Sequence, residues 1–134
     1  MTESPTLVSA CLLGLACRWD GRSKPAALDL LGPVLPVCPE GAAGFGVPRP
    51  AIELTSRDRV RIVATGEDVT DRLSAASARL VSQALGLGVQ RALLKERSPS
   101  CGVHQTHREG AVVSGSGHFA AQVVAAGIAV EAVP

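Results

Sequence analysis

Short apolar runs recur along this chain and predict the strands of an α/β protein. The clearest runs cover residues 6–10, 34–37, 89–94 and 128–133, and residues 60–63 form a weaker candidate. Each run has the length of a strand, and residues 89–94 are almost continuously apolar, as in a buried strand. These five runs define the expected sheet.

The stretches between the runs contain the expected helices. Thr70 is a suitable N-cap, and apolar residues then recur at helical spacing until Gly86 ends the pattern. Residues 25–31 and 117–126 predict two shorter helices, whereas residues 12–24 and the glycine- and proline-rich residues 41–50 predict loops. Strands that alternate with helices indicate βαβ units. We therefore predict one Rossmann-like, three-layer α/β domain over residues 1–134, with a mainly parallel sheet.

Composition narrows the class of protein. The chain has 134 residues, 46% of them hydrophobic, and a formal net charge of +1. This charge gives no bulk electrostatic attraction to nucleic acids or membranes. No apolar run approaches the roughly 20 residues of a membrane span, and the N-terminus lacks the pattern of a signal peptide. We expect a cytoplasmic protein, in which four cysteines are more typical of metal binding or catalysis than of disulfides.

Three of the four cysteines follow predicted strands. Cys11 and Cys38 come directly after residues 6–10 and 34–37, and Cys101 follows residues 89–94 after a short turn. Functional groups of an open parallel sheet gather beyond the carboxyl ends of its strands, so these thiols can converge on one metal or cluster site. The alternative is that each cysteine is simply a small buried apolar residue.

Two short motifs surround these cysteines. In Cys38-Pro39-Glu40, the proline holds a carboxylate close to whatever Cys38 binds, where it could move protons; the alternative is a solvated loop glutamate. In residues 98–102, Ser-Pro-Ser-Cys-Gly, two hydroxyl groups precede Cys101. The preceding charges, including Lys95 and Arg97, could balance an anionic cluster or simply mark an exposed strand end.

A zinc site is a separate alternative. Cys101, His104 and His107 follow one another at three-residue spacing, which a zinc ion in a loop could use. His118 shows no partner in the sequence, and we interpret it as structural or exposed.

Taken in order, the motifs resemble one bacterial family. They are VSACLLG (8–14), CRWDG (17–21), VCPE (37–40), PRPAIE (48–53), GEDVT (66–70) and LKERSPSCG (94–102). In this order they resemble the family that includes the 2-thiouracil desulfidases, and they cover most of the chain.

The resemblance implies an iron–sulfur enzyme. It implies a 4Fe–4S cluster held by Cys11, Cys38 and Cys101, with one iron left open, and removal of sulfur from a thiolated pyrimidine. From the chemistry of an open iron we expect this removal to be a hydrolysis without net electron transfer. Glu40 and Ser98 are the implied assisting residues, and Ser100 is the less favoured serine. Catalytic metal sites keep an open coordination position, and an iron with such a position can act as a Lewis acid.

This chain also departs from the family pattern. Trp19 stands where the family usually has tyrosine, and residues 103–107 and 115–120 differ from the usual stretches, which leaves the substrate open. Cys17 could be a packing residue, a transient ligand or a sulfur acceptor, and we favour packing. The competing function is a non-catalytic iron–sulfur or zinc protein that senses or carries metal or sulfide.

Overall fold

The computed structural model describes residues 4–28, 30 and 32–134 and contains two four-stranded sheets. The first is fully parallel, with the order β2-β1-β5-β8. Its strands are β1 (Thr6–Ser9), β2 (Val34–Val37), β5 (Arg91–Lys95) and β8 (Ala129–Val133). The mainly parallel α/β fold expected from the sequence is thus confirmed.

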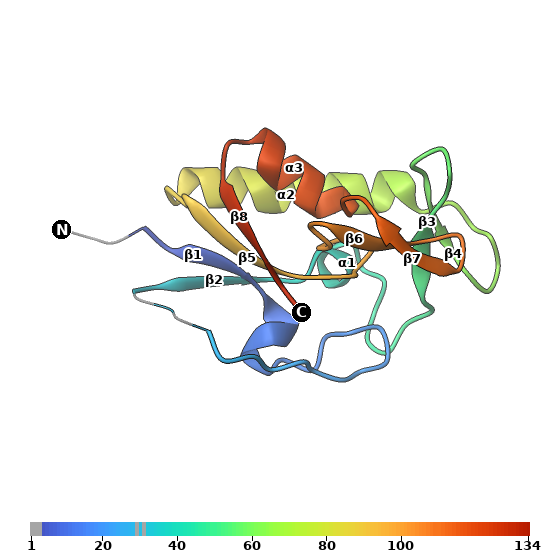
Figure 1. Cartoon of the computed structure of the whole chain (residues 1–134), viewed down its shortest axis with the longest axis horizontal. Coiled ribbons are helices and arrows are strands. Elements are labelled where there is room, and N and C mark those ends of the chain that lie inside the picture. The colour runs from blue at the N-terminus through green and yellow to red at the C-terminus, as the bar shows by residue number, and fades with distance from the viewer. Residues whose placement is uncertain (1–3, 29, 31) are drawn as a thin grey trace.

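Helices cover one face of the parallel sheet. These are α2 (Thr70–Gly86) and α3 (His118–Ala125), which lie side by side over β5 and β8 in Figure 1. Their apolar side chains, Phe119 and Val123 among them, form the largest core cluster with Leu7 and Leu94 of the sheet. The predicted boundaries of both helices agree with the structure to within one residue.

A coil segment forms the third layer, on the opposite face. The helix predicted at 25–31 is wrong over the described residues 25–28 and 30, whereas residues 29 and 31 lie outside the described part. Ala26, Leu28 and Leu30 are half-buried beneath the sheet, alternating with exposed or undescribed residues. Apolar residues at every second position fit an extended chain, not a helix, and the backbone N–H of Ala26 bonds to the carbonyl of Leu12 at 3.0 Å.

The second sheet was not expected from the sequence. Its order is β4-β3-β6-β7, and only the β3–β6 pair is parallel. The strands are β3 (Ile52–Leu54), β4 (Val60–Ile62), β6 (Gln105–Arg108) and β7 (Ala111–Ser114). Residues 60–63 are therefore an antiparallel strand of this sheet. At one end of the molecule, α2 reaches over the second sheet and buries Leu73 against Ile52 and Val60 (Figure 1).

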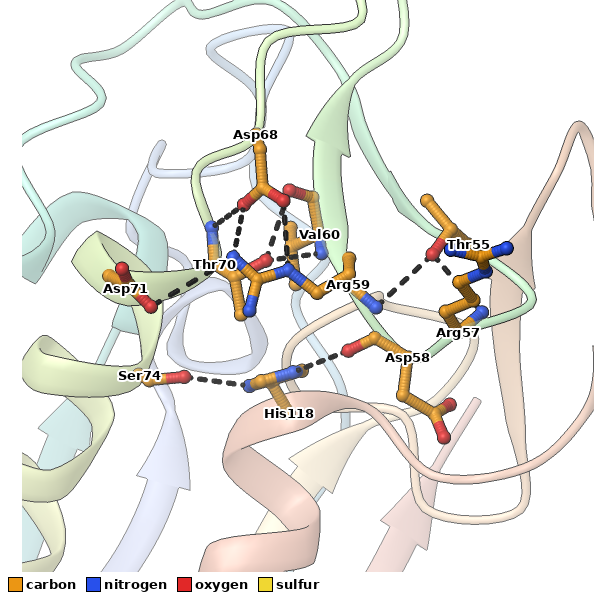
Figure 2. A network of polar contacts seen from close by, with 10 residues as sticks. All are labelled: Thr55, Arg57, Asp58, Arg59, Val60, Asp68, Thr70, Asp71, Ser74 and His118. Carbon is orange, nitrogen blue, oxygen red and sulfur yellow. Dashed lines mark hydrogen bonds and ion pairs between the residues drawn. The ribbon is translucent and has the colours of Figure 1, made fainter.

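Polar contacts tie the second sheet to the helices. In Figure 2, the His118 ring lies between the Ser74 hydroxyl, at 3.1 Å, and the carbonyl oxygen of Asp58, at 3.2 Å. The Asp68 carboxylate accepts bonds from the Arg59 guanidinium and from the backbone N–H of Thr70. His118 thus has the structural role expected of it, and it acquires partners that the sequence did not reveal.

Candidate functional site

A cavity of about 640 Å³ opens at the carboxyl ends of β1, β2 and β5. All four cysteines line it, although they come from separate parts of the chain. The second sheet closes the other side with Glu53 and His107. The topology therefore brings together the thiols that the sequence places at strand ends, as expected for a parallel sheet.

Short helices hold the first two strand-end cysteines. Cys11 lies in η1 (Ala10–Leu13), a 3₁₀ helix that begins where β1 ends and stops at Gly14 in a left-handed conformation. Cys38 is the N-cap of α1 (Pro39–Ala42), and its sulfur accepts the backbone N–H of Gly41 at 3.4 Å. The glycine- and proline-rich loop thus begins with a helical turn, because Pro39 suits the first helical position.

A turn anchored on α3 holds Cys101. The Ser98 hydroxyl oxygen accepts the backbone N–H groups of Ser100 and Cys101 at 3.1 and 3.0 Å. The carbonyl oxygen of Ser100 in turn accepts N–H groups from Phe119 and Ala120, in the first turn of α3. Exposed N–H groups at the start of a helix need such partners. The first turn of α3 therefore fixes the backbone beside Cys101.

Glu96 stabilises the same turn from the other side. Its buried carboxylate accepts backbone N–H groups from Val103, His104 and Gln105 at 2.7–3.1 Å. Burial alone would raise the pKa of Glu96, but these bonds and one from Arg97 outweigh that effect and lower it. The interpretation of this segment as an exposed strand end is wrong for Glu96.

Burial raises the pKa of three of the cysteine thiols. It raises the pKa of Cys11, and the nearby positive charges of Lys95 and Arg18 offset part of the rise. Burial, together with Cys38 and Cys11, raises the pKa of Cys17 to about 12, and burial raises that of Cys101 still further. A metal that binds thiolates here must displace these protons, while Lys95 and Arg18 favour the resulting negative charge.

Glu40 lies in a buried polar network at the same cavity. It is 8% exposed, so the alternative of a solvated loop glutamate is wrong. Arg49 Nε donates to its Oε1 at 3.1 Å, and the Ser100 hydroxyl donates to its Oε2 at 3.0 Å. Both oxygens are thereby oriented, as required of a group that acts on a bound molecule.

The two candidate serines occupy different places. Ser98 lines the cavity, and because its oxygen accepts two backbone bonds, its hydrogen is the part that can meet a ligand. Ser100 is almost fully buried and contacts Glu40. The sequence did not distinguish these two environments.

Cys17 also belongs to this site. It packs against the core cluster that contains Cys11, as expected for a packing residue, and it lines the cavity as well. Its carbonyl oxygen accepts Nη1 of Arg49 at 3.0 Å. Arg49 was not singled out as a site residue from the sequence. Its position between two prolines, which limits its backbone freedom, was the available signal.

The donor set fits a group larger than a single ion. Among the residues that the structure describes, no three His, Cys, Asp or Glu side chains are grouped so that they could hold one metal ion. The zinc site expected as an alternative at Cys101, His104 and His107 is therefore wrong. Cysteine thiolates are the usual ligands of iron–sulfur clusters, and the three strand-end thiols line one cavity of about 640 Å³.

The chain is similar in sequence and in fold to known proteins. The model of the 2-thiouracil desulfurase family matches residues 6–133. The uncharacterised protein YbbK of Bacillus subtilis (strain 168) is 33% identical over 137 residues, with 90% of each chain covered. A solved structure described as the [4Fe-4S]-dependent thiouracil desulfidase TudS matches with a TM-score of 0.88 and 35% identity, over 97% of this chain and 91% of that one.

No helix in the described part of the chain is both long enough and apolar enough to cross a lipid bilayer.

Proposed function

This chain belongs to the 2-thiouracil desulfurase family, and from that membership we propose that it is an iron–sulfur desulfidase. Residues 1–134 form one such domain, in which Cys11, Cys38 and Cys101 hold a 4Fe–4S cluster with one open iron. The substrate is a thiolated pyrimidine. The observation that carries the proposal is the convergence of three strand-end thiols on the cavity that Glu40 also lines.

The reaction exchanges sulfur for oxygen. Bound in this way, the cluster supplies an open iron as a Lewis acid for the sulfur of the substrate. Glu40 takes a proton from water as the water oxygen attacks the thiocarbonyl carbon. As the carbon–sulfur bond breaks, Glu40 returns its proton to the departing sulfur, the added hydroxyl group loses its own proton, and a carbonyl group and hydrogen sulfide remain. One thiobase and one water give one base and one hydrogen sulfide, so no electron donor or acceptor is required.

The surrounding residues support this role of Glu40. Arg49 and Ser100 fix the two carboxylate oxygens, so the proton acceptor does not need to reorganise during the reaction. The Ser98 hydroxyl donates to the substrate. Lys95 and Arg18 lie near Cys11, where their positive charges would balance the negative charge of a cluster bound by thiolates.

Iron content tests the ligand set. Anaerobically prepared protein should contain about four irons per chain, as a cuboidal cluster requires. Cys11→Ala, Cys38→Ala and Cys101→Ala should each lose most of the iron, whereas Cys17→Ala, the matched control, should keep it. Stoichiometric zinc without iron would contradict the proposal.

Isotope labelling and Glu40→Gln test the reaction. Turnover of 2-thiouracil in ¹⁸O-labelled water should release sulfide and label the product, without an added reductant or oxidant. Glu40→Gln should keep the visible spectrum of the cluster and slow turnover roughly 10²–10⁴-fold. Dependence on an electron donor would exclude hydrolysis. An intact cluster that releases sulfide from no thiobase would favour a sensor or carrier of metal or sulfide.

A further inference from the structure

Trp19 is the one indole among the residues that line the described cavity, and His107 of the second sheet provides the other aromatic ring in that list. The chain has one tryptophan, no tyrosine and two phenylalanines. Phe119 is fully buried in the main core, and Phe45 lies under the Arg72 guanidinium at 4.7 Å. Trp19 is 49% exposed although it is the largest apolar side chain available for burial. An indole that lines a cavity and is half exposed has surface available for a ligand.

The backbone of Trp19 is anchored to the site. Residues 18–22 form a closed turn, in which the N–H of Arg18 bonds to the carbonyl of Arg22 at 3.0 Å. Gly21 has a left-handed φ of 78° within this turn. The carbonyl oxygen of Trp19 accepts the backbone N–H of Arg49 at 2.7 Å. Since the Arg49 side chain also holds Glu40, the indole and the carboxylate share one rigid support.

The other described residues that line the cavity do not provide a large flat apolar surface like the indole of Trp19. Cysteines and charged groups provide the polar contacts, and Ala51, Ile52 and Val63 provide apolar contacts without a planar surface. The imidazole of His107 is flat but smaller and more polar than the indole of Trp19. A pyrimidine has polar edges and two flat π-faces. Stacking on an aromatic side chain recognises such a face independently of the substituents at the edge.

We propose that Trp19 is the stacking surface for the pyrimidine ring and the residue that restricts this site to flat heterocycles. The inference rests on the proposed function, because it concerns how that site selects its substrate. It assigns Trp19 to binding and not to proton transfer. Replacing it should therefore change KM much more than kcat.

Tryptophan fluorescence of the iron-loaded protein reports on Trp19 alone, because the chain has no other tryptophan and no tyrosine. The probes are uracil, which is flat, and dihydrouracil, which has similar polar groups on a puckered ring. Uracil should change the emission intensity saturably, whereas dihydrouracil should bind more weakly and change it less. Equal responses to the two ligands, or no response to either, would overturn the proposal.

Kinetics of two variants complete the test. Trp19→Leu keeps an apolar side chain but removes the π-face, so it should raise the KM for 2-thiouracil roughly 5- to 150-fold, the range expected for one lost stack. Its kcat and iron content should change little. Trp19→Phe restores an aromatic face and should recover most of the loss. An unchanged KM in Trp19→Leu would overturn the stacking role.

The two hypotheses can fail separately. Discrimination between uracil and dihydrouracil without any release of sulfide would retain the stacking surface and overturn the proposed reaction. Sulfide release with equal KM values in wild type and Trp19→Leu would retain the reaction and overturn the stacking surface.

Discussion

Arg49 connects three parts of the site through one buried guanidinium. Its side chain is 4% exposed and forms an ion pair with Glu40. Nη1 donates to the carbonyl oxygens of Cys17 and Gly46, each at 3.0 Å. A buried charge with this many partners fixes their relative positions, and the removal of one partner leaves the others uncompensated.

Arg49→Met should therefore reduce both stability and activity. The variant leaves the Glu40 carboxylate buried without its cation, at a cost of about 3–5 kcal/mol. We expect a lower free energy of unfolding in urea and a large drop in kcat. Arg59→Met is the matched control, because Arg59 forms its ion pair with Asp68 at the surface and should be tolerated.

A double variant separates the ion pair from simple packing. In Arg49→Met with Glu40→Gln, the buried charge is gone, so part of the lost stability should return. If the two substitutions are additive in the free energy of unfolding, Arg49 does not act through Glu40.

At the residue scale, the sequence predicted that the thiols meet but not what supports them. The placement of Cys11, Cys38 and Cys101 at one cavity could be predicted because each follows a strand, and parallel strands bring their carboxyl ends together. The roles of Arg49 and Glu96 could not, since a charged residue in a loop is usually solvated. Only the folded chain shows that Glu96 meets the backbone N–H groups of three residues that follow Cys101.

At the element scale, the start of α3 packs directly against the Cys101 turn. The N–H of Gly117 donates to the carbonyl oxygen of Gly102 at 2.8 Å. The N–H of His118 donates to the carbonyl oxygen of Pro99 at 3.0 Å. A Cβ atom on Gly117 would lie 2.5 Å from the carbonyl oxygen of Ser100. The backbone therefore has no room for a side chain at this position.

Gly117→Ala should displace the turn that carries Cys101. We expect a lower thermal midpoint and loss of iron from a variant that changes no proposed ligand. Gly86→Ala is the matched control, because no atom lies within 4 Å of a Cβ placed at this last residue of α2. There the substitution should be neutral or stabilise the helix by about 0.5–1 kcal/mol.

Calorimetry and iron analysis of the two variants provide the comparison. Full iron content in Gly117→Ala would show that the Cys101 turn does not depend on its contact with α3.

Elements with a clear apolar pattern could be predicted, whereas a strand without one could not. The helix α2 has a repeating apolar face and ends at Gly86, as predicted. The prediction of Thr70 as its N-cap is wrong, because Val69 is the N-cap and the Thr70 hydroxyl bonds to the backbone of Val60 instead. Strand β6 reads Gln-Thr-His-Arg and has no apolar alternation, because only Thr106 is fully buried there. Its pairing with β3 depends on residues more than 50 positions away, which local patterns do not reveal.

At the scale of the whole molecule, the site lies where the two sheets meet. The parallel sheet provides the strand-end thiols, and the second sheet provides Glu53 on the opposite wall. Glu53 is buried, and its Oε1 lies 2.8 Å from Nη2 of Arg61. Helix α2 packs on both sheets and so fixes their relative position. The strands that were missed from the sequence are thus the ones that close the cavity.

Removing the iron should destabilise the whole molecule. The three proposed ligands follow β1, β2 and β5, so a cluster would join segments that are far apart in the sequence. A cluster that binds the folded chain and not the unfolded chain stabilises the fold by its binding free energy, about 4 kcal/mol at 1,000 times the dissociation constant. This corresponds to a rise in the thermal midpoint on the order of 10 °C or more.

Anaerobic scanning calorimetry of iron-loaded and chelator-treated protein measures this difference. Cys17→Ala should show the full decrease on chelation, because the proposed cluster does not use its thiol. Cys38→Ala should melt at the same temperature before and after chelation, near that of the iron-free protein. Since this stabilisation comes from binding and not from catalysis, the decrease should persist when turnover is abolished by Glu40→Gln. Equal midpoints for the loaded and iron-free wild type would contradict a cluster that joins three segments.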